Sequence, residues 1–153
     1  MTTERKASLP PRWFIRTAWV AHRAYHRVTG GRRGLWPPKP GNYGTMRLVT
    51  VGRKTGKERA AILAYLEDGP NLVTMAMNGW GAPEPAWWLN LQARPDTRVE
   101  LPDGWRAVHG RAAVGEERER LWATWAALDK DLDAYAARRP GETAVVVLEP
   151  RPE

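Results

Sequence analysis

Short apolar runs alternate with glycine- and proline-containing turns along most of the chain. These runs predict six strands, at about 46–52, from the following basic turn to about 67, and at about 72–77, 97–101, 105–113 and 143–148. The segments 68–71 and 102–104 are hairpin signals because they combine Asp, Gly and Pro. Since most strands arrive as hairpins rather than as βαβ units, the pattern predicts an α+β fold on an antiparallel barrel and disfavours a Rossmann fold.

Helical periodicity predicts helices at about 12–29, 85–94 and 115–128. The first would carry a stripe of arginines beside a broad aromatic and aliphatic face. Such a helix can lie on an anionic membrane surface, or it can pack its apolar face on the domain. We expect residues 1–45 to form an N-terminal segment of basic amphipathic helix and Gly/Pro-rich loop. Residues 46–153 would form the barrel, within a single globular domain overall.

Composition narrows the functional classes. The length of 153 residues suits one domain. The absence of cysteine excludes disulfides and thiolate metal sites, and three histidines make a histidine-only zinc site improbable, so no metal is expected. We expect a cytoplasmic protein, because no signal peptide and no apolar run of about 20 residues is visible.

The net charge of +7 is unevenly distributed. Residues 1–45 carry a charge of +8, whereas residues 46–153 carry −1. A nucleic-acid-binding protein would more often place its basic residues on the folded body. We therefore expect a small-molecule partner and no nucleic acid.

The most distinctive stretch is a basic turn between two predicted strands, Gly52-Arg53-Lys54-Thr55-Gly56-Lys57. It differs from a P-loop because three residues rather than four separate its glycines, and because Glu58 follows the lysine where Ser or Thr would bind magnesium. It also precedes a strand and not a helix. The turn can hold an anion through arginine and backbone N–H groups, but nucleotide hydrolysis is not expected.

A glycine-containing loop at 76–81 precedes the run Pro85-Ala86-Trp87-Trp88-Leu89-Asn90-Leu91. On a helix Trp87 and Asn90 share a face, because they are three residues apart. They could therefore border a ligand. The alternative is that these tryptophans and leucines are core and that Asn90 is a structural cap.

Together, Gly-Arg-Lys-Thr-Gly-x-x-Arg at 52–59, Pro-Ala-Trp-Trp-Leu-Asn-Leu at 85–91 and Ala-Val-Val-Val-Leu-Glu-Pro at 144–150 resemble the deazaflavin-dependent nitroreductase family, which includes quinone reductase-like members. The resemblance implies a split β-barrel that binds coenzyme F420, a deazaflavin with a lactyl phosphate and an oligoglutamate tail. It implies hydride transfer from the reduced coenzyme to a hydrophobic quinone-like or nitroaromatic acceptor. Two alternatives stay open: a non-catalytic F420 carrier, and a reductase that uses FMN.

The resemblance also implies roles for individual residues. Arg53, Lys54 and Arg59 would hold the phosphate, and Lys57 could serve the tail. Tyr135 would face the acceptor and could donate a proton. The coenzyme-binding positions that it implies are Gly52, Arg53, Lys54, Thr55, Gly56, Arg59, Ala60, Ala61, Ile62, Leu63, Met77, Asn78, Gly79, Trp87 and Asn90. Of these, positions 60–63 would run beneath the ring, whereas 77–79 would approach the ring or the tail.

Four positions depart from the nitroreductase-type pattern. Asn78 stands where those enzymes have lysine, and Met77 replaces a small hydroxyl residue. Asp129 and Leu132 stand where they have further tyrosines. We expect coenzyme binding to survive these changes, because the phosphate turn is intact, and we expect the wall facing the acceptor to differ.

Overall fold

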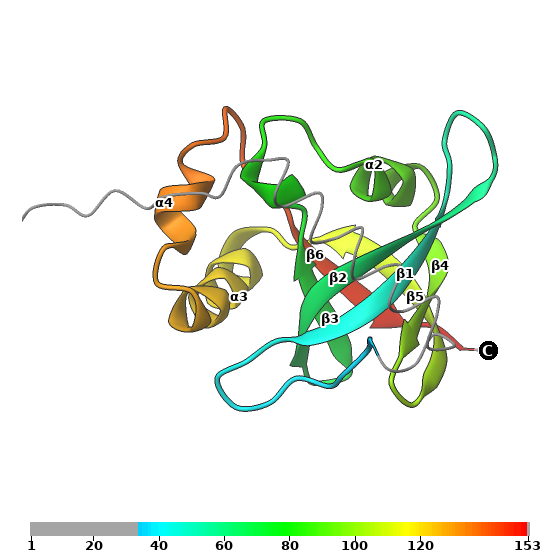
Figure 1. Ribbon diagram of the computed structural model, residues 1–153, viewed down its shortest axis with the longest axis horizontal. Helices are drawn as coiled ribbons and strands as arrows, with labels where there is room; N and C mark the ends of the chain where they lie inside the picture. Colours follow the sequence, from blue (N-terminus) through cyan, green and yellow to red (C-terminus); the bar gives the residue numbers. More distant parts are fainter. Residues whose placement is uncertain (1–33, 153) are drawn as a thin grey trace, which may run out of the picture.

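The computed structural model describes residues 34–152, in which six antiparallel strands form a closed barrel in the order β1-β2-β3-β6-β5-β4 (Figure 1). The strands are β1 (Gly44–Val51), β2 (Glu58–Asp68), β3 (Asn71–Met75), β4 (Asp96–Leu101), β5 (Gly104–Ala112) and β6 (Val145–Pro150). The helices are α2 (Ala86–Ala93), α3 (Gly115–Leu128) and α4 (Leu132–Ala136), with a 3-10 turn, η1 (Asn78–Trp80). The predicted six-stranded antiparallel barrel is confirmed.

Several boundaries differ from the sequence-based prediction. The last strand begins two residues later than predicted and reaches Pro150. The short helix α4 and the turn η1 were not predicted, because neither is long enough to display a hydrophobic period. The predicted helix at 12–29 lies outside the described residues, so the division into 1–45 and 46–153 stays a prediction. Within residues 34–152, no helix combines the length and apolarity needed to span a membrane.

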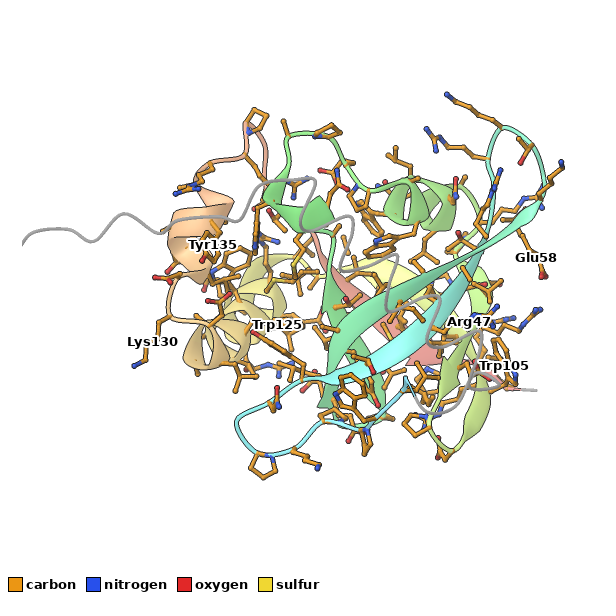
Figure 2. All side chains as sticks on the ribbon, in the orientation of Figure 1. Arg47, Glu58, Trp105, Trp125, Lys130 and Tyr135 are labelled. Atoms are coloured by element: carbon orange, nitrogen blue, oxygen red, sulfur yellow. The ribbon has the colours of Figure 1, made fainter. Side chains whose placement is uncertain are left out.

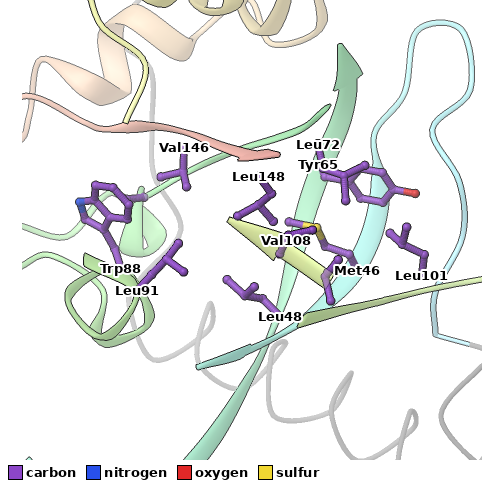
Figure 3. Packing of buried hydrophobic residues seen from close by; sticks show 12 residues of the cluster. Met46, Leu48, Tyr65, Leu72, Trp88, Leu91, Leu101, Val108, Val146 and Leu148 are labelled. Atoms are coloured by element: carbon purple, nitrogen blue, oxygen red, sulfur yellow. The ribbon is translucent and has the colours of Figure 1, made fainter. Parts of the chain in front are cut away.

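The barrel interior is filled from most of its strands and closed at one end by α2. Figure 3 shows Met46, Leu48, Val108 and other interior side chains, with Trp88 and Leu91 entering from α2. Close packing of this helix depends on Gly110 of β5: a Cβ there would lie 2.5 Å from Leu91 Cδ2. The missing side chain therefore lets α2 settle directly on the barrel.

A second apolar cluster lies outside the barrel, beneath α3 and α4. Val145 and Val147 of β6 point into this cluster, whereas Val146 and Leu148 point into the barrel. Alternation along a strand sends successive side chains to opposite faces, so β6 is buried on both. This explains why its sequence is a continuous apolar run. Leu121 and Trp125 supply the α3 side of the cluster, and Leu132 supplies the α4 side.

Candidate active site

A cavity of about 510 Å³ opens between the β1–β2 turn, the start of β2 and the helix α2. Ligand-binding cavities typically measure about 300–1,000 Å³. Three of its lining side chains are cations, and among residues 34–152 no acidic side chain lines it. This charge favours an anionic ligand. The lining residues are Thr50, Gly52, Arg53, Lys54, Thr55, Arg59, Ala60, Ala61, Asn78, Pro85, Ala86, Trp87 and Asn90.

The basic turn joins β1 to β2, as predicted, and backbone hydrogen bonds define its shape. The N–H of Gly52 donates to the carbonyl of Lys57 at 2.8 Å, and the N–H of Gly56 donates to the carbonyl of Gly52 at 2.8 Å. Gly56 has φ +70°, a conformation that side chains disfavour. Arg53 and Lys54 are exposed at the tip between these glycines.

Asn90 connects this turn to α2. Its Oδ1 accepts a hydrogen bond from the backbone N–H of Arg53 at 3.1 Å and another from the Arg53 guanidinium at 3.3 Å. Its amide nitrogen donates to Thr50 Oγ1 at 3.4 Å, and the residue is only 5% exposed. Asn90 therefore restrains the turn from below. It also lines the cavity, so the two interpretations of Asn90, as part of a site and as a structural cap, are compatible.

The register of β1 against β2 brings the third cation to the same place. Arg59 lies directly opposite Thr50, and Ala60 and Ala61 follow it. Beyond Ala61, Ile62 is buried and Leu63 packs against the barrel core. The lining along β2 thus ends at Ala61.

The loop between β3 and α2 has an unusual backbone. Asn78, Gly79 and Trp80 have φ values of +47°, +59° and +62°, three left-handed residues in a row. Left-handed conformations are uncommon for non-glycine residues. The side-chain amide of Asn78 donates to the carbonyl of Pro83 at 2.9 Å and so closes the loop on itself. Asn78 lines the cavity, whereas Met77 packs against the outer apolar cluster.

Tyr135 lies on α4 and does not line the cavity. Its ring centroid is 6.0 Å from that of Trp80, and the Arg138 guanidinium lies 6.0 Å from the tyrosine ring. Figure 2 shows Tyr135 and Glu58, which begins β2 beside the basic turn, on opposite sides of the molecule. Tyr135 therefore neighbours the loop at 78–80 and not the basic turn between β1 and β2.

Most predicted binding residues are brought together in one place. Those that line the cavity are Gly52, Arg53, Lys54, Thr55, Arg59, Ala60, Ala61, Asn78, Trp87 and Asn90. Those outside the lining are Gly56, Ile62, Leu63, Met77, Gly79 and Tyr135. Sequence reasoning missed Thr50, Pro85 and Ala86 as lining residues. Pro85 and Ala86 begin the quoted tryptophan motif, whereas Thr50 resembles any β-branched strand residue and gave no signal.

Two ion pairs fix α3 on the barrel, away from the cavity. The Arg111 guanidinium hydrogen-bonds Glu117 and lowers the pKa of that carboxyl below its ordinary value of 4.5. The Arg120 guanidinium binds both carboxylate oxygens of Asp68, at 2.8 and 3.0 Å, and lowers the pKa of Asp68 below 3.8. Both carboxylates are therefore charged near neutral pH.

Relatives with known names match much of the chain. A Mycobacterium tuberculosis protein provisionally named as an F420H(2)-dependent quinone reductase is 32% identical over 107 residues, covering 70% of this chain and 90% of the relative. A second M. tuberculosis protein, named F420H(2)-dependent quinone reductase, is 34% identical over 94 residues, covering 59% of this chain and 62% of the relative. A solved structure titled as an F420-H2 dependent reductase is 25% identical, with a TM-score of 0.61, covering 69% of this chain and 93% of that one.

The family model described as F420H(2)-dependent quinone reductase matches residues 18–150. This match confirms the predicted resemblance to deazaflavin-dependent reductases, and with it the expected enzyme class and the expected coenzyme F420. The chain belongs to the F420H(2)-dependent quinone reductase family.

Proposed function

We propose that this chain transfers a hydride from reduced coenzyme F420 to a quinone-like acceptor, with the coenzyme bound in the cavity beside the β1–β2 turn. The observation that carries the proposal is the cavity lining. It combines three cations with an apolar wall, and no acidic side chain of the described residues takes part. The family to which the chain belongs is described as F420H(2)-dependent quinone reductase, and this description supports a quinone-like acceptor.

The cationic end of the cavity suits the anionic part of the coenzyme. Arg53 and Lys54 are exposed at the turn, and Arg59 approaches from β2. Arginine makes forked, charge-assisted hydrogen bonds to phosphate, and lysine adds a point charge. In this proposal the three side chains hold the lactyl phosphate, while Lys57, outside the lining, meets the glutamate tail.

The apolar end of the cavity suits the planar ring. Ala60 and Ala61 are small enough to leave room for it, and Trp87 offers a flat face for stacking. Leu63 would support this wall from within the barrel, and the buried Ile62 would adjoin the wall from the opposite face of β2. The bound coenzyme supplies the hydride, whereas the protein supplies position and exclusion of water.

Reduction of a quinone requires a proton in addition to the hydride, and we propose that Tyr135 provides it. The phenol can donate to the oxygen on which charge develops as the hydride arrives. Its ring lies 6.0 Å from that of Trp80, whose loop also carries Asn78 of the cavity lining. Replacing Tyr135 with phenylalanine should lower kcat and leave the affinity for the coenzyme unchanged. A loss of coenzyme affinity with unchanged kcat would contradict this role.

Anaerobic turnover with a panel of acceptors tests the proposal. Reduced coenzyme F420 would be mixed with the protein and with naphthoquinones, benzoquinones or nitroaromatics, and return of the oxidised deazaflavin absorbance would be followed. Turnover with quinones supports the proposal, and the same panel tests whether nitroaromatics are also reduced. Tight coenzyme binding without turnover on any acceptor would favour the carrier. Tighter binding of FMN than of F420 would favour a flavin-dependent reductase.

The basic segment at 12–29 suggests a source for a hydrophobic acceptor. We propose that it contacts the anionic surface of the cytoplasmic membrane, where quinones reside. Sedimentation with vesicles containing anionic phospholipid would compare the full chain with one lacking residues 1–30. Loss of pelleting in the shorter chain supports membrane contact. Equal pelleting of both contradicts it.

A further inference from the structure

Arg139 lies three residues beyond α4 and is only 6% exposed. All three nitrogens of its guanidinium donate hydrogen bonds. It donates to three backbone carbonyls and one carboxylate of the distant segment 76–84, and to the hydroxyl of Thr143, four residues further along the chain. The hydrogen bonds run from Nε to Gly81 O at 3.0 Å, from Nη1 to Ala76 O and Thr143 Oγ1 at 2.8 Å each, and from Nη2 to Pro83 O at 3.3 Å and Glu84 Oε1 at 3.4 Å.

These contacts match the geometry of arginine specifically. A guanidinium carries five N–H donors in a rigid planar fork, and every one can be assigned an acceptor here. Three of the acceptors are carbonyls of the single loop 76–84, at its start and near its end. The ammonium of lysine has three donors around one nitrogen and cannot span both ends of the loop.

The hydrogen bonds from Arg139 to the loop at 76–84 are called the clamp below. This loop is the one with the left-handed backbone. Asn78 and Trp80 occupy a region of φ that non-glycine residues avoid, so their conformation persists only where the surroundings enforce it. Two hydrogen bonds within the loop, from Trp80 N–H to Met77 O and from Gly81 N–H to Asn78 O, depend on that conformation. Arg139 adds four hydrogen bonds to residues 76–84, one at the start of the loop and three near its end.

The same loop serves both sides of the proposed reaction. Asn78 lines the coenzyme cavity, and the ring of Trp80 lies beside that of Tyr135. We propose that Arg139 is a positioning residue for reduction: it holds the loop in the conformation that presents Asn78 to the cavity and Trp80 to Tyr135, without contacting coenzyme or acceptor. This role rests on the proposed function, because it assumes that the cavity binds the coenzyme.

Hydrogen exchange of the coenzyme-free protein tests the structural half of the proposal. Arg139→Lys should raise exchange in peptides covering 76–84 at least tenfold relative to the parent protein. Arg151→Lys is a matched control, because Arg151 also donates to carbonyls, those of Val108 and Thr97, and none of these residues lines the cavity. The control should leave the loop unchanged. Equal protection of the loop in Arg139→Lys and the parent would overturn the proposal.

Coupling to Asn78 tests the functional half. Asn78→Gly removes the side chain without straining the backbone, and its effect on the dissociation constant of F420 would be measured in the parent and in Arg139→Lys. We expect a severalfold loss of affinity in the parent and little further loss in the variant. If the two substitutions weakened F420 binding additively, Arg139 would have only a structural role, and the proposal would be overturned.

The two measurements fail separately. If the parent protein does not bind F420, the proposed function is wrong, while the exchange experiment still tests the clamp. Should Arg139→Lys not fold, Glu84→Ala replaces it, because that side chain is 36% exposed and supplies a single acceptor. This variant should raise exchange in the same peptides by a smaller factor. Unchanged exchange in Glu84→Ala would then count against the clamp.

Discussion

The backbone N–H of Arg53 donates to Oδ1 of Asn90 at 3.1 Å, although the two residues are 37 positions apart in the chain. This bond ties the basic turn to the helix that covers the end of the barrel. An exposed turn with two glycines would otherwise sample many conformations. The phosphate-binding geometry proposed above therefore depends on a buried amide that need not touch the phosphate.

Replacing Asn90 with alanine should loosen the turn. The loss of its hydrogen bonds is expected to lower the free energy of unfolding by about 1–2 kcal/mol. The affinity for F420 should fall about tenfold, because the cations of the turn are no longer held in position. Chemical denaturation and coenzyme titration measure the two effects. Gln92→Ala, an exposed change on the same helix, should alter neither. Full coenzyme affinity in Asn90→Ala would show that the turn needs no such restraint.

A side chain at position 110 should displace α2. A Cβ there would lie 2.5 Å from Leu91 Cδ2, so Gly110→Ala overpacks the helix against β5. Overpacking of this kind costs about 1–3 kcal/mol. Thermal unfolding would measure the loss, with Gly141→Ala as the control, because a Cβ at Gly141 would meet no atom within 4 Å. Equal melting temperatures for the two variants would contradict the packing described here.

A larger residue at position 60 should block the ring end of the cavity. Ala60 is exposed and lines the cavity, so Ala60→Leu fills space without disturbing the core. We expect at least a tenfold loss of F420 affinity with an unchanged melting temperature. Ala93→Leu, at the exposed end of α2 and outside the lining, should bind normally. Normal F420 binding by Ala60→Leu would mean that the ring binds somewhere other than beside Ala60.

Acid should weaken the attachment of α3. The Arg111 and Arg120 partners lower the pKa values of Glu117 and Asp68 in the folded protein below the ordinary 4.5 and 3.8. The folded state therefore binds these protons less tightly than the unfolded state. Stability from the pairs is complete above about pH 5 and is lost as pH falls through the folded pKa values.

Denaturation midpoints between pH 6 and pH 3 would measure this loss. Because both side chains of the Arg111–Glu117 pair are partly exposed, this pair should contribute no more than about 1 kcal/mol. The variant Glu117→Gln should be less stable at pH 6 and should flatten the acid slope. An unchanged slope would mean that the pair contributes nothing.

The features that follow from local chemistry were predictable from the sequence. The 102–104 turn and the alternating strands lead directly to the barrel, and the continuous apolar run at 145–148 is a strand buried on both faces. The basic turn was predictable for the same reason, since its glycines and cations are contiguous.

Features that depend on long-range contacts gave no local signal. Arg139 lies in a stretch with another arginine, a proline and a glycine, where sequence alone suggests a solvated loop. Its acceptors at Ala76, Gly81 and Pro83 are more than 50 residues away, and they are backbone carbonyls that any sequence would offer. Only the folded arrangement reveals the clamp. Thr50 escaped notice in the same way, because its contact with Asn90 spans 40 residues.

The central claim is that the basic turn holds the phosphate of coenzyme F420. The most direct test is titration of the purified protein with F420, repeated for Arg53→Ala, for Lys54→Ala and for the control Lys130→Ala, an exposed lysine outside the lining between α3 and α4 (Figure 2). Loss of a charge-assisted contact costs on the order of 1.5–3 kcal/mol, or about ten- to a hundredfold in affinity. We predict that loss for the two turn variants and none for the control. Equal affinity in all four proteins would contradict the account.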